Sequence, residues 1–233
     1  MNQDIIIYHG SQQIVEVPKY GIGKEYNDYG QGFYCTESIE LAKEWACPIE
    51  KDGYSNKYIL HLADLNIMHL TQGEFNILNW LAILLAHRKF DITSAVGSNA
   101  KEFILSHYMP DTENVDVMIG YRADDSYFSF AEDFVNNTIS LRDLNIAMQL
   151  GTLGEQIVLL SERSFQKIEF IEYEIADYRK YYHQRTTRDK NARTEYATRK
   201  KNLQQLMADI FILDIIREDM KNDDPRLRSY ISE

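Results

Sequence analysis

Cysteine, proline and long apolar runs are scarce in this sequence, and each scarcity excludes a class of protein. Cys35 and Cys47 are the only cysteines among 233 residues and match no metal-ligand spacing, so we expect no metal site and a reduced, cytoplasmic protein. Four prolines leave no Pro-rich linker. The longest apolar run, around Trp80 to Ala86, is too short to cross a bilayer, so no membrane segment is expected.

Positive charge is also in short supply. The chain has 25 Lys and Arg against 36 Asp and Glu, and the resulting net charge of -11 argues against a protein that coats nucleic acid through its overall field. Residues 179–201 are the exception, with nine Lys or Arg and two acids, a local +7 that leaves -18 elsewhere. Interleaved tyrosines suit this stretch to RNA or DNA. A solvated helix face and a segment that docks on the acidic body are the alternatives.

Glycine is absent beyond Glu174, where the composition of the chain changes. We therefore divide the sequence into a domain over 1–175 and a basic, amphipathic helical extension over 176–233. Leu203 to Met220 has apolar residues at helical spacing, and this helix is a possible docking site for an antitoxin or another regulatory protein.

Alternating and helical patterns together predict an α+β fold. Strands are expected over Ile5–Tyr8, Phe33–Thr36, Lys57–Leu62, Val115–Gly120, Gln156–Leu160 and Lys167–Ile171. Helices are expected over Glu37–Ala46, with Thr36 as its N-cap, and over Phe75–His87, Ala95–Tyr108, Phe130–Asn136 and Leu141–Leu150.

Two short segments near the N-terminus carry the clearest chemical signal. The first strand ends in His9-Gly10-Ser11, where a glycine lets a flat ring approach the backbone and the imidazole can donate to a ribose hydroxyl. Gly30 and Gly32 then frame an aromatic strand that turns either Phe33 or Tyr34 into a pocket. Each segment alone is better explained by a strand end or by core packing.

These segments resemble a known family when they are taken together. The order His9-Gly10-Ser11, then Gly30 to Tyr34, then Ala42 and Trp45, resembles the diphtheria-toxin and poly-ADP-ribose polymerase branch of ADP-ribosyltransferases, with Trp in place of the usual stacking Tyr. A bacterial family of ADP-ribosyltransferase-like domains of uncharacterised function is more similar still. Its shared stretches include Ile77 to Trp80, Gly120 to Asp125 and Leu153 to Val158, and the likeness covers Ile5 to Glu174.

The resemblance implies two strongly bent antiparallel sheets that hold NAD as a co-substrate in a cleft. His9 would hold a ribose, Gly10 the carboxamide, and Tyr34 with Trp45 the nicotinamide ring. The residues implied for NAD binding are His9, Gly10, Ser11, Gly32, Phe33, Tyr34, Thr36, Trp45 and Arg122. Nicotinamide would leave through an oxocarbenium-like state that a carboxylate stabilises, and a nucleophile would then add to the ribosyl carbon.

The position of that carboxylate is open between two neighbours. Glu155 is the catalytic acid in one alignment, and Gln156 occupies the position in the other. Because alternate strand residues point to opposite faces, the two side chains do not both enter the cleft. We favour Glu155 slightly, with Gln156 as the alternative.

A polar segment after the fourth strand is the candidate for substrate recognition. Arg122 would pair with a pyrophosphate, while Asp124, Asp125 and Tyr127 would contact the acceptor. A loop ion pair followed by an aspartate N-cap explains the same residues equally well.

The function implied is that of an NAD-dependent mono-ADP-ribosyltransferase acting on a protein or nucleic acid, as a bacterial toxin or defence effector. A module that binds NAD or ADP-ribose without turnover is the first alternative, and Gln156 in the cleft would favour it. An NAD glycohydrolase, with water as the acceptor, is the second.

Overall fold

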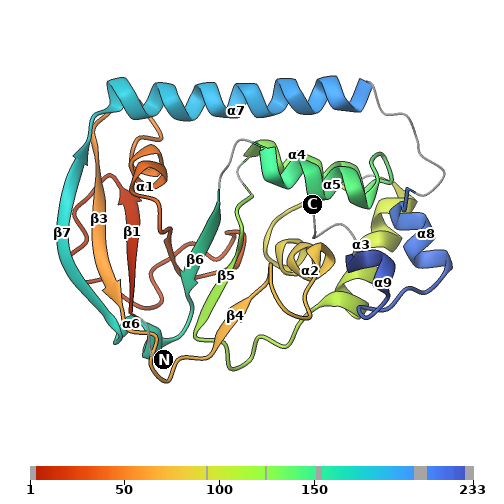
Figure 1. Cartoon of the computed structure of the whole chain (residues 1–233), viewed down its shortest axis with the longest axis horizontal. Coiled ribbons are helices and arrows are strands. Elements are labelled where there is room, and N and C mark those ends of the chain that lie inside the picture. The colour runs from red at the N-terminus through yellow and green to blue at the C-terminus, as the bar shows by residue number, and fades with distance from the viewer. Residues whose placement is uncertain (1–3, 93, 124, 151–153, 202–208, 229–233) are drawn as a thin grey trace.

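The structure, a computed structural model, describes residues 4–92, 94–123, 125–150, 154–201 and 209–228. Its strands form two sheets (Figure 1). The first is antiparallel, in the order β1 (Ile5–Ser11), β3 (Gly53–Leu60) and β7 (Ile168–Ala176). The second has the order β2 (Phe33–Cys35), β6 (Glu155–Leu159), β5 (Val117–Tyr121) and β4 (Ile67–His69), and only β4 runs parallel to its neighbour. The α+β class is therefore confirmed.

A single backbone bridge joins the edges of the two sheets. Tyr8 on β1 and Thr36 just beyond β2 exchange hydrogen bonds of 2.8 and 3.0 Å. Between the sheets lies a core of apolar side chains, with Ile7 and Tyr58 from the first sheet and Ile157 from the second. The two sheets are thus packed together on one side of the bridge and part on the other.

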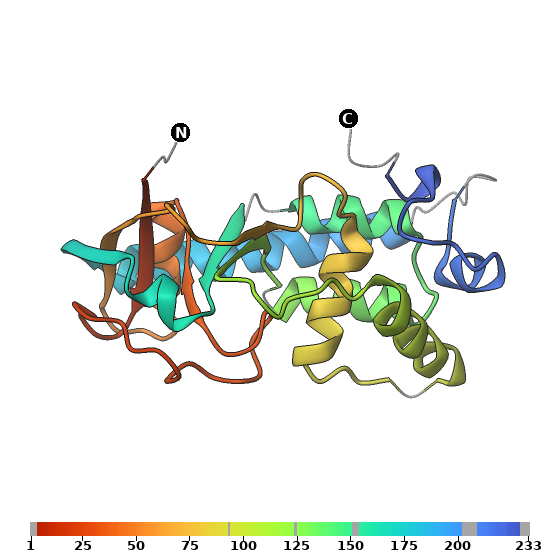
Figure 2. The same cartoon turned by 90° about the horizontal axis from the view of Figure 1, so that it is seen from below.

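Helices cover the remaining faces, at bounds set largely by side-chain caps. They are α1 (Ile39–Ala46), α2 (Ile77–His87), α3 (Ala95–Tyr108), α4 (Asp125–Val135), α5 (Leu141–Gln149), α6 (Glu162–Phe165), α7 (Tyr178–Lys201), α8 (Ile212–Arg217) and α9 (Pro225–Arg228). Seen from below, α2, α3, α8 and α9 gather beside the second sheet, away from the first (Figure 2). A larger core around Trp80, Leu81 and Phe134 fills that side.

Helix α1 lies unusually close to the first sheet because glycines face it. A Cβ on Gly10 of β1 would overlap the carbonyl oxygen of Ala42, and one on Gly53 of β3 would overlap that of Ala46. Trp45 is carried by the same helix. The glycine of the His-Gly-Ser segment therefore fixes where α1 places the indole.

Helix α7 runs along one side of the molecule, from the first sheet to the helices beside the second (Figure 1). Arg188 pairs with Glu44 of α1 at 2.6 Å, and the buried Tyr181 hydroxyl bonds Glu40 of the same helix. At the far end the Tyr196 hydroxyl donates to Asp133 of α4 at 2.6 Å. The basic segment thus docks on the acidic body, and these tyrosines serve that contact.

The sequence predictions differ from the structure in several places. Helix α4 begins at Asp125, five residues before the predicted Phe130, and α6 was not predicted. The cap of α1 is Ser38, whose Oγ accepts from the Leu41 N–H, so the helix starts after the expected Glu37 and Thr36 bonds the Ser38 N–H instead. Strand β4 was not predicted. A continuous helix over Leu203–Met220 is wrong, because residues 209–211 are not helical and α8 covers only Ile212–Arg217. Residues 202–208 lie outside the described ranges.

In the described part of the chain, every helix is too short or too polar to span a bilayer.

Replacing Gly10 by alanine tests the close approach of α1. The added Cβ meets backbone atoms that cannot rotate away, so we expect a loss of about 3 kcal/mol or more in the free energy of unfolding, at the upper end for overpacking. Gly73→Ala is the control, because its Cβ meets no atom within 4 Å and costs only about 1–2 kcal/mol for a positive φ. Urea denaturation measures both, and equal losses would contradict the packing argument.

Candidate functional site

A cavity of about 980 Å³ opens where the two sheets part. Its walls come from the end of β1, from β2, from the loop that joins them, from α1, and from the segments after α2 and β5, with one residue of β6 and one of α7. Nine residues predicted to form the site line it, namely His9, Gly10, Ser11, Gly32, Phe33, Tyr34, Trp45, Arg122 and Gln156. The structure thus brings together residues as far apart in the sequence as His9 and Gln156, which are 147 positions apart.

His9 holds the sheets apart at this point. Continuing the Tyr8–Thr36 bridge in antiparallel register would pair Gly10 with Tyr34. Instead the Tyr34 carbonyl accepts from His9 Nδ1 at 2.8 Å, and the imidazole stacks on Phe33 with ring centroids 4.3 Å apart. Gly10 directs its N–H and C=O to the same side as Tyr8 does, toward the gap that results.

The same contact fixes the chemistry that His9 offers. A carbonyl accepts only, so Nδ1 carries the proton and Nε2 is an acceptor in the neutral ring. Burial lowers the pKa of His9 below its ordinary value of 6.5, against the opposing effect of the bond to Tyr34. In the neutral ring His9 can therefore only accept from a ligand hydroxyl through Nε2, which corrects the donating role expected from the sequence.

Tyr34 presents its ring and not its hydroxyl. The Tyr34 hydroxyl donates to the Gly30 carbonyl at 2.7 Å and accepts from the Tyr29 N–H at 3.0 Å. Burial raises the pKa of Tyr34 far above its ordinary value, so the group stays neutral. The backbone of Tyr29 and Gly30 thus holds the Tyr34 side chain against the cavity.

Trp45 forms another part of the wall. The guanidinium of Arg122 lies over its indole ring, 4.2 Å from the centroid. One face of the ring is therefore occupied by a cation, which the sequence did not indicate. The indole N–H is buried and has no acceptor among the described residues.

Strand β6 turns Gln156, and not Glu155, into the cavity. Gln156 is buried and donates through Nε2 to Asp28 Oδ2 at 3.1 Å and to the Tyr121 carbonyl at 3.2 Å. Glu155 points to the other face of the sheet, where it bonds His69 Nε2 at 2.9 Å and accepts from the Thr71 hydroxyl. The preference for Glu155 is therefore corrected: alternation places it away from the site.

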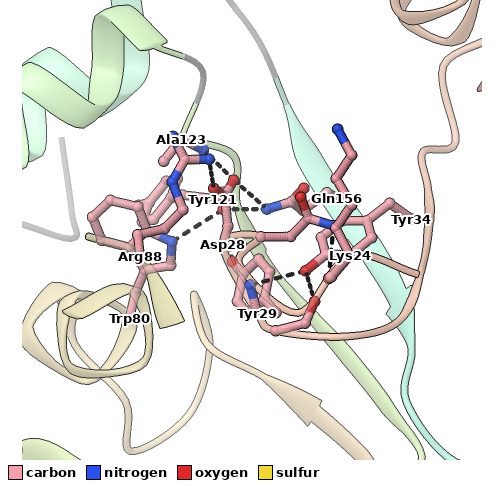
Figure 3. Close-up of polar contacts among 11 residues, drawn as sticks. Lys24, Asp28, Tyr29, Tyr34, Trp80, Arg88, Tyr121, Ala123 and Gln156 are labelled. Atoms are coloured by element: carbon pink, nitrogen blue, oxygen red, sulfur yellow. Dashed lines mark hydrogen bonds and ion pairs between the residues drawn. The ribbon is translucent and has the colours of Figure 1, made fainter. Parts of the chain in front are cut away.

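The carboxylate that does line the cavity is Asp28, which the sequence reasoning missed. Figure 3 shows it between Arg88 and Gln156. Asp28 Oδ1 accepts from Arg88 at 3.1 Å, and Oδ2 accepts from the Ala123 N–H at 2.9 Å as well as from Gln156. Burial raises the pKa of Asp28 above its ordinary value of 3.8, although these partners and Arg122 pull it down. An aspartate in an irregular loop gave no pattern by which to find it.

Besides Glu155, four predicted site residues stand elsewhere or are not described. Thr36 is buried at the sheet bridge and does not line the cavity. Tyr127 is fully buried, and its hydroxyl donates to the Leu150 carbonyl inside the helical core. Asp125 begins α4, and Asp124 lies outside the described residues. The loop proposed for acceptor recognition thus contributes Arg122 and Ala123 to the cavity.

Acid should weaken the fold through His9. Its folded-state pKa is depressed, so the unfolded chain binds more protons below 6.5 and the free energy of unfolding falls as pH drops. Each unit of depression corresponds to about 1.4 kcal/mol. In His9→Gln the fall should be smaller, whereas His183→Gln, an exposed ring on α7, should keep the wild-type slope. Urea titrations across this range measure it, and parallel slopes for all three proteins would refute the assignment.

Comparison with known proteins gives one match. No curated protein and no solved structure matches the chain. Residues 5–170 match the model of a family described as "Protein of unknown function (DUF3990)". This match takes in both sheets up to the middle of β7 and every cavity-lining residue except Arg185. The chain belongs to that family.

Proposed function

We propose that the chain binds NAD in this cavity and transfers its ADP-ribosyl group to a macromolecular acceptor, as the resemblance of its motifs to ADP-ribosyltransferases implies. One observation carries the proposal. His9, Gly10, Tyr34 and Trp45, predicted from separate motifs, line a single cavity at the parting of two sheets. Packing alone gives no reason for these side chains to converge.

The size and polarity of the cavity support a dinucleotide. Its volume of about 980 Å³ is at the upper end of small-molecule pockets. His9 Nε2 is an acceptor suited to a ribose hydroxyl, and the N–H and C=O of Gly10 suit a carboxamide, which has one donor group and one acceptor. Among the described residues the lining also carries Lys19, Lys24, Arg88, Arg122 and Arg185 against one acid, Asp28. This excess of cations suits the two phosphates of NAD.

The reaction would break the bond between the nicotinamide nitrogen and ribose C1′. The electron pair leaves with nicotinamide and neutralises its ring, C1′ becomes electron-poor, and a nucleophile of the acceptor adds there and loses its proton. The Gln156 Nε2 group is engaged with Asp28 and Tyr121, and Oε1 receives no hydrogen bond from a described residue, so Gln156 would act through Oε1. Asp28 holds the amide in that orientation, so an acceptor oxygen faces the ligand.

A binding module without turnover is the second candidate, and Gln156 favours it. An amide oxygen carries only a partial charge and stabilises an oxocarbenium ion less than a carboxylate does. Asp28 does not replace that carboxylate directly, because both of its oxygens already accept hydrogen bonds. In this case NAD or ADP-ribose binds and stays intact.

Incubation with adenylate-labelled NAD and cell extract tests the proposal, with label on macromolecules as the readout. We expect transfer by the wild type and a loss of roughly 100-fold in Gln156→Ala, the size seen when one preorganised polar group is removed from an active site. Glu155→Gln is the matched control: it alters the adjacent residue on the opposite face and should retain transfer within about twofold.

Other results separate the alternatives. NAD binding by calorimetry with no label transferred selects the binding module, and free labelled ADP-ribose alone selects an NAD glycohydrolase. A Gln156→Ala protein as active as the wild type would refute the role of Gln156.

A further inference from the structure

Helix α7 adds a residue to the cavity from outside the region that defines the family. Arg185 lines the cavity, yet the family match ends at residue 170 and α7 begins at Tyr178. Arg185 is half-buried and has no ion pair or hydrogen bond with any described residue. An Arg side chain at a cavity wall that has no carboxylate partner can bind an anion from solution.

The anchoring of α7 determines where Arg185 points. Tyr181 and Arg188 lie one turn before and one turn after it, so the three share a face of the helix. Both neighbours are fixed to α1, Tyr181 through Glu40 and Arg188 through Glu44. The helix therefore cannot rotate Arg185 away without breaking these contacts.

Two further residues that line the cavity, Arg122 and Trp45, carry hydrogen-bond donors. Arg122 lies over the Trp45 ring, and the Trp45 N–H is buried without an acceptor among the described residues. Buried indole N–H groups usually have a partner. Together with Arg185 these residues supply two guanidinium groups and an indole N–H, which are donors that suit an oxyanion with several acceptor oxygens and suit no cation.

We propose that Arg185, with Arg122 and the Trp45 N–H, binds a phosphate group of the ligand, so that α7 is part of the ligand site. The inference rests on the proposed function in naming NAD as the physiological source of that phosphate. A nucleic-acid strand fits less well, because Tyr181 and Tyr196 of α7 are engaged with the body and are not available for base stacking.

The test is calorimetric titration with ADP, inorganic pyrophosphate and adenosine, using the full chain. Arg185→Gln should weaken ADP and pyrophosphate by about 10- to 100-fold, the value of one charge-assisted hydrogen bond, and leave adenosine unchanged. Arg185→Lys should recover part of the loss. Lys190→Gln, an exposed cation on the same helix that does not line the cavity, should bind as the wild type does.

The outcomes separate this inference from the proposed function. A wild type that binds ADP through Arg185 but neither binds nor consumes NAD retains the phosphate site and loses the NAD proposal. ADP affinity within twofold of wild type in Arg185→Gln overturns the phosphate site, as does an equal loss for adenosine, which marks a structural effect. A wild type that binds neither ADP nor pyrophosphate overturns it as well.

Discussion

The Asp28 carboxylate is the contact on which the arrangement of the cavity depends. It joins four parts of the chain: the loop before β2, Arg88 at the end of α2, the Ala123 N–H after β5, and Gln156 on β6. Removing a carboxylate from water is costly, and only a full set of donors offsets that cost. The raised pKa of Asp28 means that the offset is incomplete. A buried carboxylate of this kind contributes little to stability. Its direct effect is to orient the Gln156 amide and the segment that carries Arg122.

The opening of the cavity follows from one side chain that takes the place of a backbone bond. In a continued ladder between β1 and β2, the Tyr34 carbonyl would accept from a backbone N–H. In the structure it accepts from the His9 side chain through Nδ1. The strands then diverge, and the backbone of Gly10 faces a gap and not a neighbouring strand. On a face of the same strand, the missing Cβ of Gly10 lets α1 approach and bring Trp45 to the gap. The adjacent residues His9 and Gly10 therefore have different tasks, one opening the site and the other positioning its wall.

Sequence patterns predicted the helices and strands whose buried residues recur at the spacing of that element. Helix α3 has the predicted bounds, Ala95–Tyr108, and most strands lie within a few residues of their predicted positions. Strand β4 is only three residues long, too short for alternation to register, and its pairing with β5 is a long-range contact. The same limit hid Asp28 and Arg185: each enters the cavity through tertiary packing, and neither has a sequence neighbour that marks its role.

The choice between Glu155 and Gln156 shows why a pocket residue is harder to predict than a strand. On a sheet with one wet face, alternation of polar and apolar residues would decide which neighbour points inward. Strand β6 is covered on both faces, with Val158 in the helical core and Ile157 and Leu159 between the sheets, so the apolar run after Gln156 carries no such information. The face is decided across the sheet, where Gly120 of β5 lies opposite Gln156. A Cβ there would collide with the Tyr29 hydroxyl, which donates to the Tyr121 carbonyl beside the Gln156 amide. Gly120 thus leaves space on this face for Tyr29. The Tyr29 hydroxyl and the Gln156 amide both donate to the Tyr121 carbonyl, so Gln156 has its polar partner on this face.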